Sequence, residues 1–325
     1  EEYSAGVVFR HEQTLAKPKA DRLDLLRATR AHFGQIFMLY SGAGKVDALL
    51  DLAASRDTSP DIEVTDEYDV VHRVWKISDA PAIAAVREQM RERKLIIADG
   101  HHRYETALAY RNERRAAAGA GEEETTDAGA DYDWAMMTFV DMDCPGLVIL
   151  PTHRVVFGLP SISATHFHEE ARKFFNVEEV DAGIDAAHAT GILQQAGHAG
   201  TALLAITAGR AFLLHSPKAI GTIRFGDLSL RQQALDVVQL HKCVLEGVLK
   251  ITEEAIRNQE SVSYCREAAE ALAQVRSGQA QAAFLMNPAR MEQVRDIAFA
   301  GEVLPQKSTD FAPKLLSGLT IYALE

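Results

Sequence analysis

The sequence predicts a mixed α/β fold, and three of its features carry this prediction. Short apolar runs such as Ile36–Tyr40 and residues 95–98 have the length and branching of buried strands. Segments such as residues 79–93 space their apolar side chains three and four positions apart, as amphipathic helices do. From Leu230 onward the pattern is mainly helical. Strands that alternate with helices in this way are typical of a sheet covered by helices.

The first half of the chain is expected to form one α/β unit that ends near Val156. Asp79 is the expected N-cap of a helix whose apolar face holds Ile83, Val86 and Met90. Residues 119–131 are rich in Gly, Ala, Thr and Glu, which predicts a solvated loop. Strands are predicted at residues 7–10, 36–40, 71–77, 95–98, 134–140 and 147–150, and helices at residues 21–32, 79–93 and 103–118.

The second half repeats the alternation and then becomes helical. We predict an α/β domain over residues 1–156, a small α+β subdomain over 157–229, and a mainly helical region over 230–325 that returns to the core. Helices are predicted at residues 163–175, 184–196, 230–250, 264–276 and 291–299, and strands at residues 177–180, 202–206, 211–215 and 282–286.

Composition and charge narrow the function classes. The chain is 47% hydrophobic and 25% charged, as ordinary globular proteins are. With 34 Lys and Arg against 46 Asp and Glu, its net charge is −12, and it has no block of basic residues. Broad binding to nucleic acid is therefore not expected, because that binding needs clustered cations. A local basic site stays compatible with this charge.

The cysteines and the hydropathy pattern predict a cytoplasmic protein. Cys144, Cys243 and Cys265 are odd in number and far apart, which suits isolated thiols better than disulfides or a zinc site. No apolar run approaches the roughly 18 residues that a membrane-spanning helix needs. The chain opens without a methionine on what looks like a strand, so we expect its natural N-terminus upstream.

The strongest local signal for function lies at residues 95–107. An apolar strand ends at Asp99, Gly100 allows a sharp turn, and a helix begins at once. The first turn of a helix has unpaired amide groups and partial positive charge, so it attracts phosphate. His101 and His102 add donors, and Arg103 can bind a phosphate in bidentate fashion. Asp99 is a candidate general base or Mg²⁺ ligand.

Two other interpretations of this segment stay open. An Asp-Gly turn before a helix is common, so the segment can be purely structural. Adjacent histidines can also ligate a metal, although neighbouring side chains point in different directions and no further ligands follow at a familiar spacing. No pattern points to zinc, haem or flavin.

The segment Asp99-Gly100-His101-His102-Arg103-Tyr104 resembles the signature of the ParB/sulfiredoxin-like superfamily, in which a Gly-x-x-Arg turn cradles nucleotide phosphates. More closely, the chain is identified as a member of the domain-of-unknown-function 1015 family. The stretches that match this family occur in its order along nearly the whole chain, at residues 21–30, 97–107, 150–154 and 304–309.

The resemblance implies a ParB/sulfiredoxin-like α/β core and a nucleotide ligand such as ATP, ADP or CTP. In the superfamily, free serine kinases phosphorylate a small alcohol and ParB proteins act as CTP-dependent switches. Sulfiredoxins place a reactive cysteine where this chain has His101, so sulfinic-acid repair is not expected. The resemblance also implies a further segment upstream, which is expected to precede Glu1.

Further candidate residues lie outside this turn. Thr152, His153 and Arg154 follow a predicted strand, which would deliver His153 and Arg154 to the sheet edge that holds Asp99. An ordinary loop with a surface arginine is the alternative interpretation. Arg27 and Arg30 lie three apart on one predicted helix face, where they are able to clamp an anion, face solvent or form an ion pair. The loop residues Lys307, Ser308 and Thr309 have phosphate-binding chemistry but lack a P-loop pattern.

Three hypotheses about function follow. The first is a nucleotide-dependent phosphotransferase for a small hydroxylated metabolite, in which Asp99 is the base or Mg²⁺ ligand and Arg154 and Lys307 neutralise charge. The second is a nucleotide-binding switch of ParB type without turnover of a small molecule. The third is a phosphate-ester hydrolase that uses Asp99 and His102. The partners expected are a small molecule and a nucleotide, with no membrane, and the oligomeric state is left open.

Overall fold

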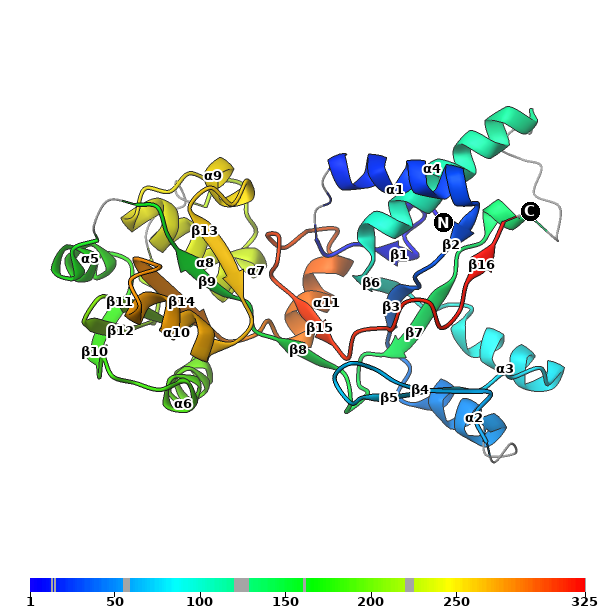
Figure 1. Ribbon diagram of the computed structural model, residues 1–325, viewed down its shortest axis with the longest axis horizontal. Coiled ribbons are helices and arrows are strands. Elements are labelled where there is room, and N and C mark those ends of the chain that lie inside the picture. The colour runs from blue at the N-terminus through cyan, green and yellow to red at the C-terminus, as the bar shows by residue number, and fades with distance from the viewer. Residues whose placement is uncertain are drawn as a thin grey trace. The chain divides into compact units, whose positions relative to one another are not determined.

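The computed structural model describes residues 1–12, 14, 16–54, 59–119, 129–159, 162–219 and 225–324, with the side chains of 16–18 excepted. The chain forms two compact units (Figure 1). Unit 1 comprises Glu1–Val148 and Pro313–Glu325, and unit 2 comprises Ile149–Ala312. Both units combine helices with sheets, so the predicted mixed α/β class is confirmed.

Unit 1 is built on a four-stranded sheet in the order β1-β6-β3-β7. Strand β6 pairs parallel to β1 and antiparallel to β3, and β3 pairs parallel to β7. Its core contains Val8, Ile36, Met38, Ile97 and Tyr104. The strands are β1 (Val8–Phe9), β2 (Ala31–His32), β3 (Ile36–Tyr40), β4 (Ile62–Thr65), β5 (Val71–Val74), β6 (Leu95–Asp99), β7 (Met137–Asp141) and β16 (Tyr322–Ala323).

Helices α1 and α4 of unit 1 pack against each other (Figure 1). Strands β4 and β5 form a separate hairpin, and β16 pairs with β2. The Asp79 side chain accepts a hydrogen bond of 2.9 Å from the amide of Ala82, which confirms the predicted N-cap. The helical segments are η1 (Tyr3–Ala5), α1 (Ala16–Thr29), α2 (Lys45–Ala54), α3 (Ala80–Met90), α4 (His101–Ala118) and η2 (Asp131–Asp133).

Unit 2 is built on a six-stranded antiparallel sheet in the order β10-β12-β11-β14-β9-β13. These strands come from all three of the predicted segments, with β9 from 1–156 and the others from 157–229 and 230–325. They are β9 (His153–Val156), β10 (Asn176–Val180), β11 (Ala202–Thr207), β12 (Arg210–His215), β13 (Val262–Cys265) and β14 (Ala282–Met286). Strands β8 (Val148–Leu150) and β15 (Asp310–Ala312) pair separately.

The middle of the sheet of unit 2 is buried on both faces, which explains why strands β11 and β14 are almost wholly apolar. On β11, Leu203 and Ala205 face one core cluster, while Leu204 and Ile206 face the other. A strand that is buried on both faces has a continuous run of apolar residues, whereas a strand buried on one face alternates apolar and polar residues. The helices are α5 (Ala164–Ala171), α6 (Ala186–Gly197), α7 (Leu230–Gln233), α8 (Asp236–Gln239), the π-helix η4 (Leu240–Val248), α9 (Glu253–Arg257), α10 (Ala268–Arg276) and α11 (Met291–Phe299).

Several boundary predictions are wrong. The helix predicted at residues 264–276 begins only at Ala268, because Val262–Cys265 pairs with β9 as a strand. The helix predicted at 230–250 consists of α7, α8 and η4, and the strand predicted at 71–77 ends at Val74. Helix α2 and strands β4 and β9 were not predicted. Most of the loop predicted at residues 119–131 lies outside the described residues.

Candidate functional site

The turn after β6 has the geometry that its sequence predicts. Asp99 is the last residue of β6, and Gly100 follows in a left-handed conformation with φ of +96°. Helix α4 then begins at His101 and runs for 18 residues. The amide of Gly100 donates to Asp99 Oδ1 over 2.7 Å, which holds the carboxylate at the turn. A sheet strand therefore passes directly into the positive end of a long helix.

Arg103 folds back over this turn. Its Nη2 lies 3.6 Å from Asp99 Oδ2, a distance longer than that of a hydrogen-bonded ion pair. Its Nε is buried and has no hydrogen-bond partner within the described part of the chain. Burial lowers the pKa of the guanidinium, the Asp99 carboxylate raises it, and the nearby cation Arg22 lowers it again. Arg103 thus forms a long ion pair with Asp99 and keeps Nε as an unused donor.

His101 points into the core of unit 1. It is 7% exposed, and its ring meets that of His11 edge-on, with centroids 4.8 Å apart. The amide of His11 donates to His101 Nε2 over 3.4 Å, and His11 Nδ1 lies 2.7 Å from the carbonyl oxygen of Ile97. Burial, and then the His11 ring, lower the pKa of His101 well below its usual range. The His101 ring is therefore neutral and packs on the inner side of the turn. The neighbouring His102 is half-buried.

Glu105, which the sequence did not single out, organises the next turn of α4. It accepts hydrogen bonds from Thr14 Oγ1 at 2.8 Å and from Lys19 Nζ at 2.9 Å. The Lys19 and Thr14 hydrogen bonds outweigh the effect of burial and lower the pKa of Glu105. This contact ties the start of α1 to α4. No local spacing signals it, because the partners are 86 and 91 positions from Glu105.

A second polar cluster lies at the other end of the same sheet. Asp141 is 1% exposed and accepts from the amides of Gly42 at 3.3 Å and Gly44 at 2.8 Å. The hydroxyl of Tyr40, which pairs with Asp141 across β3 and β7, is buried without a hydrogen-bond partner among the described residues. Burial, Asp47 and Asp141 raise the pKa of Tyr40 to about 12. Because β6 runs antiparallel to β3, this end is opposite the end that holds Asp99.

The expectation that Thr152, His153 and Arg154 reach the sheet edge of Asp99 is wrong. Strand β9, which carries His153 and Arg154, belongs to the six-stranded sheet of unit 2, whereas Asp99 ends a strand of the four-stranded sheet. His153 is 4% exposed, and its Nδ1 accepts from the amide of Met286 at 3.3 Å. Burial and Arg154 lower the pKa of His153 to about 4, so the ring is neutral.

Arg154 is a buried cation of unit 2, only 1% exposed. Its guanidinium donates to the carbonyl oxygens of Thr152 and Lys307, the latter at 3.1 Å, and lies 5.1 Å from the centre of the Tyr264 ring. The structure therefore brings Thr152, Arg154 and the 307–309 loop together. Lys307 itself is exposed with a positive φ of 58°, Ser308 Oγ donates to the carbonyl oxygen of Pro305, and Thr309 is half-buried.

Arg27 and Arg30 do not form the predicted pair on one helix face. Arg27 binds Glu113 through two nitrogens, at 3.1 and 2.6 Å, and Asp24 through a third. Arg30 follows the last residue of α1 and has a positive φ of 48°. Arg27 is thus already neutralised by carboxylates.

No group of three or more His, Cys, Asp or Glu side chains within the described ranges is arranged to hold a metal ion. None of the helices described is both long and apolar enough to cross a membrane.

The fold and the turn together define a mixed α/β protein in which a glycine turn joins a sheet strand to a long helix. The model of the family described as proteins of unknown function (DUF1015) matches residues 1–238, so the chain belongs to this family. No curated protein sequence is significantly similar to the chain.

Solved structures are similar at low identity. A conserved hypothetical protein from Pyrococcus furiosus is 13% identical, with 96% of this chain and 90% of that chain covered and a TM-score of 0.44. A free serine kinase in complex with AMP is 12% identical, with coverages of 98% and 88% and a TM-score of 0.46. SbnI from Staphylococcus aureus, with a C-terminal truncation, is 12% identical, with coverages of 96% and 82% and a TM-score of 0.42.

Proposed function

We propose that this protein is a phosphate-recognising enzyme, a nucleotide-dependent phosphotransferase that acts on a small hydroxylated metabolite. The buried Nε of Arg103, which lacks a hydrogen-bond partner among the described residues, is the observation that carries the proposal. A buried donor without an acceptor is costly, and a phosphate oxygen would remove this cost. The first-turn amides of α4 would bind the same group.

The surroundings of the turn favour an anion. Arg22 lies close enough to Arg103 to lower its pKa, and Arg10 and His102 act in the same way on His101. This local positive charge exists in a chain whose net charge is −12. Clustered cations at a helix N-terminus attract phosphate more strongly than isolated ones do.

Asp99 is the proposed general base or Mg²⁺ ligand. Its side chain is 50% exposed, and Oδ1 is held by the Gly100 amide while Oδ2 faces Arg103. A single carboxylate fits the usual way in which Mg²⁺ arrives with a nucleotide, bound mainly by phosphates and water. Deprotonation of the acceptor hydroxyl by Asp99 would generate the nucleophile for phosphoryl transfer.

The test separates binding from chemistry. The full chain is incubated with ATP, ADP, CTP or pyrophosphate and a panel of sugars, amino acids and other alcohols, and donor consumption is measured. Arg103→Gln is expected to weaken nucleotide binding by about tenfold or more, because a charged hydrogen bond is lost. Arg114→Gln, an exposed change on the same helix, is the matched control and should leave binding unchanged.

Asp99→Asn is expected to abolish turnover and leave nucleotide bound. Donor consumption no greater than that of Asp99→Asn would rule out the phosphotransferase. Nucleotide binding without turnover would instead favour a nucleotide-dependent switch. If Arg103→Gln leaves nucleotide binding unaffected, the proposed phosphate site at residues 99–103 is ruled out.

A further inference from the structure

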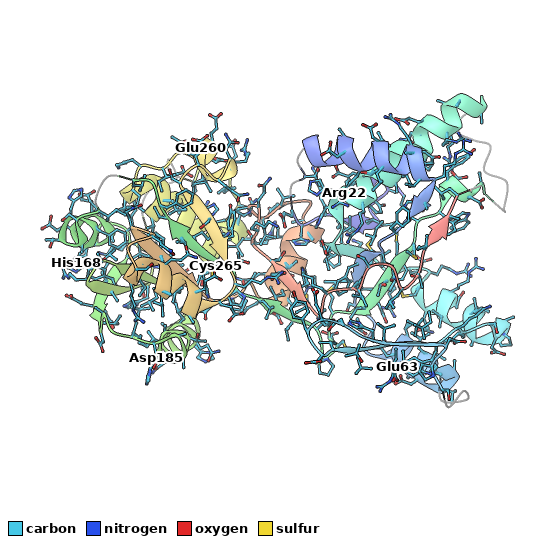
Figure 2. All side chains as sticks on the ribbon, viewed as in Figure 1. Arg22, Glu63, His168, Asp185, Glu260 and Cys265 are labelled. Atoms are coloured by element: carbon cyan, nitrogen blue, oxygen red, sulfur yellow. The ribbon has the colours of Figure 1, made fainter. Side chains whose placement is uncertain are left out.

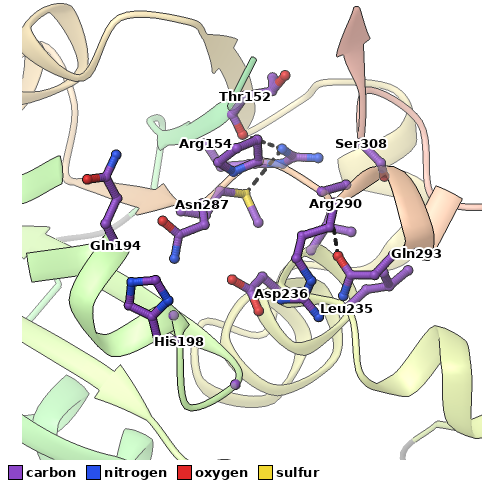
Figure 3. Close-up of a pocket in the computed structure, with 16 residues that line it drawn as sticks. Thr152, Arg154, Gln194, His198, Leu235, Asp236, Asn287, Arg290, Gln293 and Ser308 are labelled. Atoms are coloured by element: carbon purple, nitrogen blue, oxygen red, sulfur yellow. Dashed lines mark hydrogen bonds between the residues drawn. The ribbon is translucent and has the colours of Figure 1, made fainter. Parts of the chain in front are cut away.

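Unit 2 contains a cavity of 340 Å³ that none of residues 99–103 lines (Figure 3). Its walls come from the end of α6, the start of α8, the segment that follows β14 and the start of α11. Polar side chains from these elements converge on it, which is the arrangement of a small-molecule site. The side chains that carry the inference are His198, Asp236, Asn287, Arg290 and Gln293.

Arg290 supplies an available positive charge. It is the N-cap residue of α11, and its amide donates to Gln293 Oε1 over 2.9 Å, which fixes the backbone at this point. Its exposed guanidinium has no ion pair within 4.0 Å in the part of the chain that the structure describes, although Asp236 lies close enough to feel its charge. A guanidinium with free donors binds a carboxylate well.

Asp236 supplies a fixed acceptor beside Arg290 (Figure 3). The amide of Ala202 and the hydroxyl of Thr201 hold its carboxyl group. Burial raises the pKa of Asp236 to about 7, against these hydrogen bonds and the charge of Arg290. The group is therefore only about half ionised at neutral pH, and its oxygens are suited to accept from a hydroxyl partner.

Asn287 adds a second fixed acceptor. Its Nδ2 donates to the carbonyl oxygen of Leu193 at 2.8 Å. The close approach depends on Gly197, where a Cβ would lie 2.5 Å from that nitrogen. One amide hydrogen of Asn287 is committed to the backbone of α6, which fixes the side chain and leaves its oxygen to accept a hydrogen bond.

The lining also limits the size and type of ligand. The apolar part of the lining comes from residues such as Leu235, Val237 and Met286, and among the described residues the cavity is lined by no Phe, Tyr or Trp. The imidazole of His198 is the one aromatic ring in this described lining, so a nucleobase would find little surface to stack on. A volume of 340 Å³ is at the small end of ligand sites. Arg290 and the buried Arg154 make the cavity positive, which opposes a ligand ammonium group.

We infer that this pocket binds a small hydroxycarboxylic acid, whose carboxylate pairs with Arg290 and whose hydroxyl donates to Asp236 or Asn287. The inference is independent of the proposed function, because no residue of the turn after β6 takes part.

Calorimetric titration of the full chain tests whether the pocket binds hydroxycarboxylic acids. L-malate, D-glycerate and L-lactate are compared with succinate and propionate, which lack the hydroxyl, and with amino acids of similar size. At least one hydroxy acid is expected to bind about tenfold more tightly than its deoxy counterpart. Arg290→Gln should weaken that binding about tenfold, whereas Arg295→Gln, on the same helix and paired with Asp296, should not.

Asp236→Ala should reduce the preference for the hydroxyl, and circular dichroism checks that this variant is folded. If Asp236→Ala is unfolded, the comparison of hydroxy acids with their deoxy counterparts in the unaltered protein still tests the inference. The inference is overturned if deoxy acids or amino acids bind as tightly as hydroxy acids do. It is also overturned if no hydroxy acid binds at concentrations up to about 10 mM, or if Arg290→Gln leaves the affinity unchanged. Arg103→Gln should leave hydroxy-acid binding intact. The two proposals, the hydroxy-acid pocket and the phosphate site at residues 99–103, can therefore fail independently of each other.

Discussion

The Arg103 guanidinium occupies the space that a side chain at Gly100 would need (Figure 2 shows the side chains of this unit around α4). A Cβ built on Gly100 would lie 2.9 Å from both Nε and Nη2 of Arg103. Gly100 also has φ of +96°, which L-residues with a side chain rarely adopt. The glycine is therefore required twice, once for the turn into α4 and once for the approach of the guanidinium.

Gly100→Ala is expected to destabilise unit 1 by about 1–3 kcal/mol and to weaken anion binding, because the methyl group displaces Arg103. Gly119→Ala is the matched control. Gly119 ends the same helix with φ of +69°, and a methyl group there would have no atom within 4 Å among the described residues, so it tests backbone strain alone. Urea unfolding measures the loss of stability and nucleotide titration measures affinity. Equal affinities of the two variants would contradict the steric role.

Asp141→Ala is expected to release the glycine loop after β3. The carboxylate accepts from the amides of Gly42, Gly44 and Asp143, and its removal leaves the buried amide of Gly42 and two part-buried amides without their acceptor. We expect a loss of about 2–3 kcal/mol in the free energy of unfolding of unit 1. Asp143→Ala, at an exposed position, should cost far less. Both tryptophans of the chain, Trp75 and Trp134, belong to unit 1, so tryptophan fluorescence reports on this unit.

The sequence predicts local elements well because neighbouring residues determine them. The strand at Leu95–Asp99, the glycine turn and the helix after it follow from apolar runs and from the freedom of glycine. Of two adjacent histidines, His101 is the buried one, and His11, 90 positions away, packs against it. That outcome depends on tertiary contacts, which no local pattern encodes.

The same limit applies to the polar groups of unit 2. Asp236 and Arg290 are 54 positions apart in the sequence, and they meet because both lie beside the six-stranded sheet. His153 and Arg154 look like loop residues after the run that ends at Leu150. They form a central strand instead, because β13 and β14 pair with them on either side. Strand pairing over such separations is decided by the fold as a whole.

Asp236 gives unit 2 a pH dependence of defined sign. The pKa of Asp236 is raised to about 7 in the folded protein, from 3.8, chiefly by burial. The folded state therefore binds a proton that the unfolded state releases, so stability falls as pH rises from about 4 to about 7. Asp236→Asn should remove this decline and stabilise unit 2 at pH 8 by about 2 kcal/mol. Hydrogen exchange of the β11 amides at pH 5 and pH 8 measures it, and the same decline in the variant would contradict the assignment.

The buried histidines of unit 1 give the opposite sign. Burial lowers the pKa of His11 to about 4, and that of His101 lies well below its usual range. Protons then bind the unfolded state more readily between pH 6.5 and 4, so stability is full above about pH 6.5 and is lost as pH falls. We expect the free energy of unfolding of unit 1, followed by tryptophan fluorescence in urea, to fall by about 1 kcal/mol per pH unit or more. His11→Asn keeps a donor for the Ile97 carbonyl oxygen but cannot titrate, so it should lower stability at pH 7 and flatten this slope. His166→Asn, at an exposed position in unit 2, should leave the slope unchanged, and an unaltered slope in His11→Asn would show that other groups drive acid unfolding.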